Sequence, residues 1–126
     1  MTETLPPPQL EHICDLAVAI APPVEVGQTP AGLRRMIPIT GGVVTGPRLN
    51  GKVLAGGADF QLILGGGTQA HLDARYVIEL DDGTRVFVQN TALRFASLEN
   101  SQRIMRGEPV SPDAVYFRCQ PKLEAA

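Results

Sequence analysis

Residues 41–60 read GGVVTGPRLNGKVLAGGADF, and this stretch decides the fold of the chain. Six glycines divide short apolar runs into pieces, and the last run carries an acidic residue, Asp59. Glycines spaced in this way permit tight turns and bulges between strands. The stretch therefore predicts several short strands joined by tight connections.

The same stretch contains a near match to a nucleotide-binding P-loop, Gly46-Pro-Arg-Leu-Asn-Gly51-Lys52. A working P-loop needs a hydroxyl side chain after the lysine and a helix whose N-terminus receives the phosphate. Val53 occupies the hydroxyl position, and the glycine pair at 56–57 follows too closely for a stable helix. We therefore interpret the glycines as turn residues and expect no bound cofactor.

Composition narrows the classes of partner. A length of 126 residues predicts one domain, and a net charge of −2 argues against a nucleic-acid or anionic-membrane partner, which would need a basic patch. No apolar run approaches the roughly 20 residues that cross a bilayer, and the N-terminus lacks the basic and apolar regions of a signal peptide. We therefore expect a cytoplasmic protein.

Neither cysteines nor histidines predict a metal site or a disulfide. Cys14 and Cys119 lie near opposite ends of the chain, and in a cytoplasmic protein we expect both to be free, small, buried side chains. His12 and His71 are far apart in sequence, and no metal-ligand spacing is present. We expect no metal.

The remaining pattern is typical of an all-β protein. Residues 1–9 are rich in proline and predict a flexible arm, whereas residues 10–126 predict a single domain. Strands are expected over 10–20, 33–40, 42–46, 50–55, 58–64, 68–80, 85–91 and 115–119, with a loop at 25–32 and one short helix near 98–106. Pro38 predicts an edge position or a bulge, because proline cannot donate to the ladder.

Long alternating strands joined by tight hairpins favour a small antiparallel meander, which we expect to close into a β-barrel because closure removes exposed edges. The hairpins also set an expected register. A three-residue turn at 65–67 places Asp59 opposite Asp73 and Gln61 opposite His71. A two-residue turn at Asp82-Gly83 places Arg75 opposite Asn90. One face would then carry all six polar side chains.

Two carboxylates that face each other on a sheet repel, and in a low-dielectric interior one of them keeps a proton. We therefore take Asp59 and Asp73 as candidate catalytic acid and base, positioned by Arg75 and Asn90. The alternative is a solvated polar face, since an antiparallel sheet normally buries only its apolar side. In that case the core would consist of Phe60, Leu62, Leu72, Tyr76, Ile78 and Phe87. The pair Arg34-Arg35 is interpreted as solvated.

An ordered set of motifs from residue 10 onward resembles one bacterial and fungal family, domain of unknown function 3237, also called uncharacterised protein family 0311. The motifs are Ile39-Thr40-Gly41-Gly42, Gly46 to Val53, Gly56-Gly57-Ala58-Asp59, Asp73-Ala74-Arg75-Tyr76, Asp82-Gly83, Tyr116-Phe117-Arg118, Pro121 and Glu124. The resemblance implies a small barrel, similar in outline to lipocalin-like and allene-oxide-cyclase-like barrels. It also implies that Asp59, Asp73, Arg75, Tyr76, Tyr116 and Arg118 match positions of the family pattern.

The chain departs from the family at its C-terminal end. Family members continue beyond a Pro-x-aromatic-Glu segment into further strands, whereas this chain has Leu123 at the aromatic position and ends at Ala126. A barrel without its closing strands would expose an edge and seek a partner chain. We therefore expect a homodimer.

Three functions remain open on the sequence alone. The first is binding of a small, partly apolar molecule, whose carboxylate would meet Arg75 or Arg118, with His71, Asn90, Tyr76, Tyr116 and Gln61 as further ligand contacts. The second is a cofactor-independent isomerase, cyclase or hydrolase that uses Asp59 and Asp73. The third is a structural or accessory module whose interior is filled with side chains.

Overall fold

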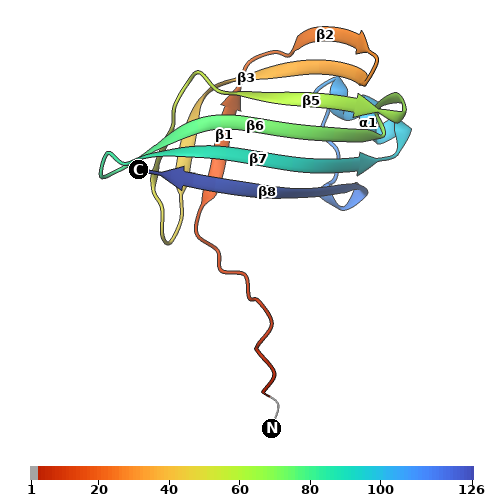
Figure 1. Ribbon diagram of the computed structural model, residues 1–126. Coiled ribbons are helices and arrows are strands. Elements are labelled where there is room, and N and C mark those ends of the chain that lie inside the picture. The colour runs from red at the N-terminus through yellow and green to blue at the C-terminus, as the bar shows by residue number, and fades with distance from the viewer. Residues whose placement is uncertain (1–2) are drawn as a thin grey trace.

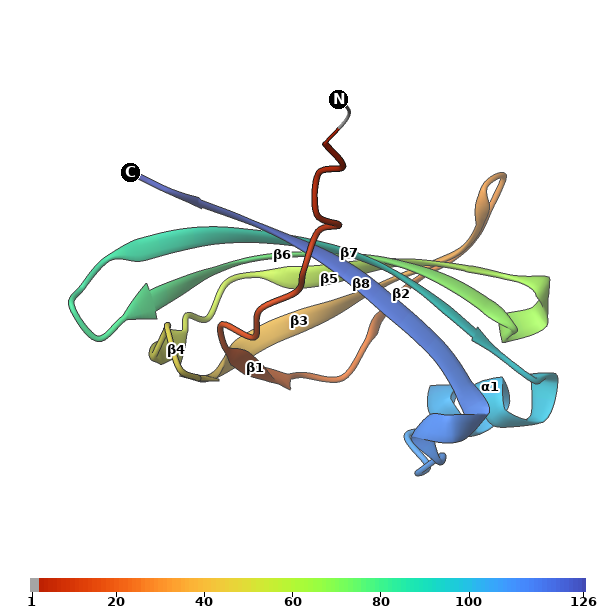
Figure 2. The same cartoon turned by 90° about the horizontal axis from the view of Figure 1, so that it is seen from below.

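The computed structural model describes residues 3–126 and shows one curved antiparallel sheet with a short α-helix at one end (Figures 1 and 2). The strands are β1 (Asp15–Ile20), β2 (Val24–Thr29), β3 (Gly32–Thr45), β4 (Gly51–Val53), β5 (Ala58–Leu64), β6 (Gln69–Leu80), β7 (Arg85–Ala96) and β8 (Val115–Ala125). The helical elements are η1 (Gly65–Gly67), α1 (Leu98–Met105) and η2 (Pro112–Ala114). The expected all-β fold with one short helix is confirmed.

Strand β3 organises the sheet because both of its edges are shared. Its first half pairs with β2 and β5, and its second half pairs with β1 and β4. Residues 25–32, expected as a loop, instead form most of β2 and its turn into β3. The register between β1 and β3 skips Thr40, which confirms a bulge close to Pro38.

Strands β5 to β8 follow one another as an antiparallel meander, the part of the fold that alternation predicts best. Strands β7 and β8 extend further than expected, to Ala96 and Ala125. Within residues 3–126, β1 and β8 do not pair with each other, so the sheet is open between them. The homodimer expected from an open edge stays a prediction.

The two faces of the sheet differ in what they bury. The inner face, which we define as the face that carries the main apolar core, holds Ile39, Val44, Val53, Tyr76, Ile78, Val86 and Val88. The outer face exposes large apolar side chains instead, among them Phe60 at 47% and Phe87 at 42%. The expected core is therefore correct for Tyr76 and Ile78 and wrong for these two phenylalanines.

The expected register is wrong at both hairpins by one residue. Thr68 belongs to the first turn, because its backbone N–H and its hydroxyl both donate to the Gly65 carbonyl, so Leu64 pairs with Gln69. The second turn has three residues, because the Leu80 N–H donates to the Thr84 carbonyl. A slip of one residue moves every side chain of a strand to the other face.

The glycine-rich block forms strands and tight approaches, not a phosphate loop. The lysine of the P-loop-like sequence lies in β4, which adds to β6 with Gly51 opposite Leu80. A Cβ atom at Gly51 would lie 2.1 Å from the Glu79 carbonyl oxygen. One at Gly42 would lie 2.2 Å from the Ala17 carbonyl oxygen. Glycine is required at both positions because neighbouring backbone approaches so closely.

Candidate functional site on the inner face

Five polar side chains lie on the inner face among apolar neighbours, and we call them the inner polar cluster. They are Arg35 from β3, Asp59 and Gln61 from β5, and Asn90 and Arg94 from β7. The register puts them there: Arg35 pairs with Gln61, while Ala74 lies between Asp59 and Asn90. Small alanines on β6 leave room above the sheet for these longer side chains.

Two neighbouring hollows contain the cluster. The Asp59 pocket, about 280 Å³, is lined by Val18, Ile20, Ile37, Ile39, Asp59, Gln61, Ala74, Tyr76 and Asn90. The helix pocket, about 420 Å³, is lined by Ile20, Pro23, Arg35, Ile37, Gln61, Arg94, Ile104, Met105, Arg106 and Gly107. Because three residues line both, the two pockets form one continuous region of the inner face.

The inner polar cluster forms few hydrogen bonds for the number of polar atoms it contains. The Gln61 amide donates to Asp59 Oδ2 at 2.9 Å. By contrast Arg35 Nε, Asp59 Oδ1 and Asn90 Oδ1 are buried without a hydrogen-bond partner in residues 3–126. A buried polar atom left without a partner costs about 1–3 kcal/mol. Three such atoms at one region indicate that the fold is organised there for something other than stability.

Electrostatics set Asp59 apart from the other acidic groups. Burial raises the pKa of the Asp59 carboxyl, against the opposing effects of the Gln61 hydrogen bond and the Arg94 charge. Burial and the nearby Arg35 charge lower the pKa of Arg94. Tyr76, at the floor of the Asp59 pocket, also has a pKa raised by burial. A carboxyl group with a raised pKa is suited to give and take a proton near neutral pH.

Asp73 does not join this site, contrary to the expected pairing. It lies on the outer face opposite Phe60, where the Arg75 guanidinium approaches it at 3.0 Å and the Gln89 amide at 3.4 Å. The hydrogen bond from Arg75 holds the pKa of Asp73 below its usual range. The two carboxylates therefore cannot act as a facing pair.

The other predicted site residues divide between the two faces. Gln61, Tyr76 and Asn90 lie on the inner face with Asp59. The outer face carries His71, Arg75, Tyr116 and Arg118, as their strand pairing shows. Gln69 contacts His71 at 2.7 Å, and the Arg118 guanidinium lies 5.0 Å from the centre of the Tyr116 ring. The solvated-face interpretation is therefore right for the polar row of β6.

Sequence reasoning missed the two inner arginines. Arg35 was interpreted as solvated, yet only 8% of it is exposed. The available signal was its alternation with Leu33 and Ile37 on one face of β3. Arg94 lies beyond the expected end of β7, at the same parity as Val88 and Asn90. Each of these arginines alternates along its strand with residues of the inner face, and that alternation was the signal that both lie there.

Within residues 3–126, the cysteines, the potential metal ligands and the helices provide no further candidate site. Both cysteines are free; Cys14 is half-buried, whereas Cys119 is exposed, contrary to expectation. Over residues 3–126, no three histidine, cysteine or acidic side chains gather as metal ligands would. None of the helices in that range is both long enough and apolar enough to cross a bilayer.

The opposite pKa shifts of Asp59 and Asp73 predict opposite pH effects on stability. An unfolded aspartate titrates near pH 3.9. The stability that Asp59 contributes is full below that pH and is lost as the pH rises through its raised folded value. The contribution of Asp73 is full above pH 3.9 and is lost as the pH falls through its lowered folded value.

We therefore expect Asp59→Asn to gain stability relative to the wild type as the pH rises from 4 to 7. We expect Asp73→Asn to lose relative stability as the pH rises from 3 to 5. Urea unfolding followed by circular dichroism across this range measures both. Slopes of the same sign for the two variants would contradict the placement of the carboxylates on opposite faces.

A curved antiparallel sheet whose inner face holds buried polar groups between apolar walls defines a β-barrel-like protein with a pocketed interior. The chain belongs to the family described as protein of unknown function (DUF3237), which it matches over residues 8–126. It is 40% identical to UPF0311 protein RPA1785 of Rhodopseudomonas palustris over 124 residues, 98% of this chain and 78% of that protein.

Solved structures agree with this membership. The crystal structure of RPA1785, described as a conserved protein of unknown function, superposes with a TM-score of 0.87 over 94% of this chain and 79% of that one. A protein from Acinetobacter baumannii described as β-barrel-like gives 0.71 at 34% identity, over 98% of this chain and 80% of that one. A more distant relative, the hydroalkoxylation enzyme phnH of Penicillium herquei, is 30% identical over 86 residues, 68% of this chain and 56% of that protein.

Proposed function

We propose that this protein binds a small, partly apolar molecule in the Asp59 pocket and the adjoining helix pocket. The observation that carries the proposal is the set of three unpartnered buried polar atoms, Arg35 Nε, Asp59 Oδ1 and Asn90 Oδ1. Ligand sites combine apolar walls with a few convergent polar groups, which is the arrangement of Ile37, Ile39 and Tyr76 around Asp59. A bound molecule would supply the missing hydrogen bonds.

The volume of the pockets favours this function over a solid interior. Single-molecule sites occupy about 300–1,000 Å³, and the helix pocket alone reaches about 420 Å³. Ala74 and Ala70 place only small side chains on the inner face of this part of β6, and Ala70 is fully buried. Larger side chains at these positions would fill the space, as an accessory module with a packed interior would require.

Filling the Asp59 pocket tests the proposal. We expect Ala74→Leu to weaken at least tenfold every ligand found in an NMR screen of small neutral aromatic molecules, because the leucine side chain would occupy the pocket. The matched control is Gln89→Leu, which adds a similar side chain on the outer face of the neighbouring strand and should leave affinities within twofold. Ligands that bind Ala74→Leu as tightly as the wild type would place the binding site elsewhere.

Asp59 and the named relative favour one catalytic function as a second candidate. Hydroalkoxylation adds an alcohol O–H across a carbon–carbon double bond, and the relative carries that reaction in its name. A protonated Asp59 would give its proton to one alkene carbon, and the hydroxyl oxygen would bond to the other. The carboxylate would then take the hydroxyl proton, which regenerates Asp59 without a cofactor.

In this catalytic function Asp59 alone acts as acid and base, in place of the expected pair of Asp59 and Asp73. In place of Asp73, Gln61 orients the Asp59 carboxyl by its hydrogen bond to Oδ2 and leaves Oδ1 without a partner among the described residues. Tyr76 and the isoleucines of β3 give the pocket apolar walls beside Asp59, and electrostatic interactions are stronger in such surroundings than in water.

A further inference from the structure

The helix pocket presents two arginines, Arg35 and Arg94, that lack a close ion-pair partner among the described residues, although the charge of Asp59 acts on Arg94 from the adjoining pocket. Arg35 is 8% exposed, and its one ion-pair contact is Glu25 Oε1 at 3.9 Å, on a glutamate that is 57% exposed. Its Nε is buried and has no hydrogen-bond partner among residues 3–126. In the part of the chain that the structure describes, the Arg94 side chain forms no hydrogen bond and no ion pair. A guanidinium group that loses hydration without gaining a partner is costly, which applies most to the buried Arg35 and in part to the half-buried Arg94.

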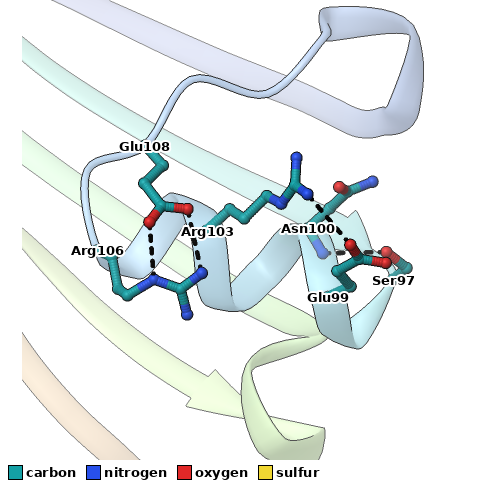
Figure 3. A network of polar contacts seen from close by, with 6 residues as sticks. All are labelled: Ser97, Glu99, Asn100, Arg103, Arg106 and Glu108. Atoms are coloured by element: carbon teal, nitrogen blue, oxygen red, sulfur yellow. Dashed lines mark hydrogen bonds and ion pairs between the residues drawn. The ribbon is translucent and has the colours of Figure 1, made fainter.

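A third arginine on the same pocket is already paired. Arg106 donates to both carboxylate oxygens of Glu108, each at 3.1 Å (Figure 3). The contrast within one pocket is informative, because Arg106 has a close partner from the chain itself. Among the described residues Arg35 has only the distant, exposed Glu25, and Arg94 has no ion pair. Arg35 and Arg94 both line the helix pocket, so their guanidinium groups are the ones there that a bound molecule could pair with.

Helix α1, which forms one wall of the pocket, is capped at both of its ends. The Ser97 hydroxyl accepts the Asn100 N–H at 3.1 Å at the start of the helix, and Arg103 pairs with Glu99 at 3.2 Å (Figure 3). At the other end, the Glu108 N–H donates to the Arg103 carbonyl across Gly107, whose φ is +77°. This is the left-handed C-terminal cap that favours glycine. The helix lines the pocket with the apolar side chains of Ile104 and Met105.

We infer that the helix pocket is a binding site for the carboxylate of a small organic acid, with Arg35 and Arg94 as its ligands. Guanidinium groups match a carboxylate in both charge and geometry, with two parallel N–H donors for two oxygens. The apolar walls, Ile20, Pro23, Ile37, Ile104 and Met105, favour an organic body over an inorganic anion. The inference rests on the proposed function, because it names the chemical class of the molecule bound.

Side-chain NMR of the full chain tests the inference directly. Benzoate, its neutral isostere benzamide and inorganic phosphate are titrated at constant ionic strength into ¹⁵N-labelled protein. The Nε–H resonances of Arg35 and Arg94, assigned with the variants Arg35→Lys and Arg94→Gln, report on binding. We expect benzoate to shift both resonances saturably and to bind at least tenfold more tightly than benzamide or phosphate.

Two variants separate the arginines. Arg94→Gln should weaken benzoate at least tenfold, whereas Arg75→Gln, whose arginine pairs with Asp73 on the outer face, should leave the affinity within twofold. The inference is overturned if benzoate causes no saturable shift at Arg35, if Arg94→Gln binds it normally, or if phosphate binds more tightly. If benzamide binds as tightly as benzoate, the proposed small-molecule site stands but the inference that it recognises a carboxylate is wrong. If neither molecule binds, the result counts against both the inference and the proposed function.

Discussion

Replacing Gly51 with alanine is expected to lower the free energy of unfolding by about 3 kcal/mol, the upper part of the range for an overpacked interior. The added Cβ would meet the Glu79 carbonyl oxygen at 2.1 Å and the Leu80 Cα at 2.7 Å. Both are backbone atoms, so no side-chain rotation relieves the clash. Strand β4 would have to move off β6, and with it Val53 would leave the apolar core. Urea unfolding followed by circular dichroism measures the loss.

Gly56→Ala is the matched control for this prediction. Gly56 has a φ of +110° and open space around its Cβ direction, so alanine there costs only backbone strain, about 1–2 kcal/mol. If the two variants lose equal stability, the close approach of β4 and β6 is not what glycine at position 51 provides.

Replacing Asp59 with asparagine is expected to slow proton-transfer catalysis by about 10²–10⁴-fold, the usual contribution of a general acid or base. Asparagine keeps the shape of the side chain and can still bond with Gln61, but it has no proton to exchange. Cyclisation of 2-allylphenol to a dihydrobenzofuran, followed by mass spectrometry in deuterated water, provides a simple hydroalkoxylation assay. The added deuterium would be found on carbon.

Asp73→Asn is the corresponding control, because Asp73 has the same chemistry on the outer face. Its rate should stay within twofold of the wild type. A wild-type rate in Asp59→Asn would exclude Asp59 as the proton donor, and equal losses in both variants would indicate a general loss of structure. Thermal unfolding of each variant distinguishes that last case.

Local periodicity located β5, β6 and α1, because alternation and helical spacing are both properties of a short stretch of sequence, but it missed β2 and the ends of β7 and β8. Strands β5 and β6 lie within one residue of the expected ranges, and α1 is capped by Ser97 and Gly107. The register could not be obtained in this way. It depends on hydrogen bonds that close the turns, such as the two from Thr68 to Gly65, and alternation carries no record of them.

The candidate site was predicted in part for the same reason. Asp59, Gln61 and Asn90 were named, and they lie together on the inner face. The sequence groups them with Asp73 and Arg75, because it predicts each hairpin turn to be one residue shorter than it is. In the structure Asp73 and Arg75 lie on the outer face. Arg35 was missed because a pair of adjacent arginines is normally solvated, although Arg35 alternates with Leu33 and Ile37 on one face of β3.

The four-residue connection from Leu64 to Gln69 has a consequence for how such proteins diverge. Strand β5 delivers Asp59 and Gln61 to the pockets only because this connection has an even number of residues, Gly65 to Thr68. Loss or gain of a single residue there would present Phe60 and Leu62 to the interior in their place. A one-residue insertion or deletion in this surface loop, away from the pockets, would therefore replace the polar residues that line the pockets with apolar ones.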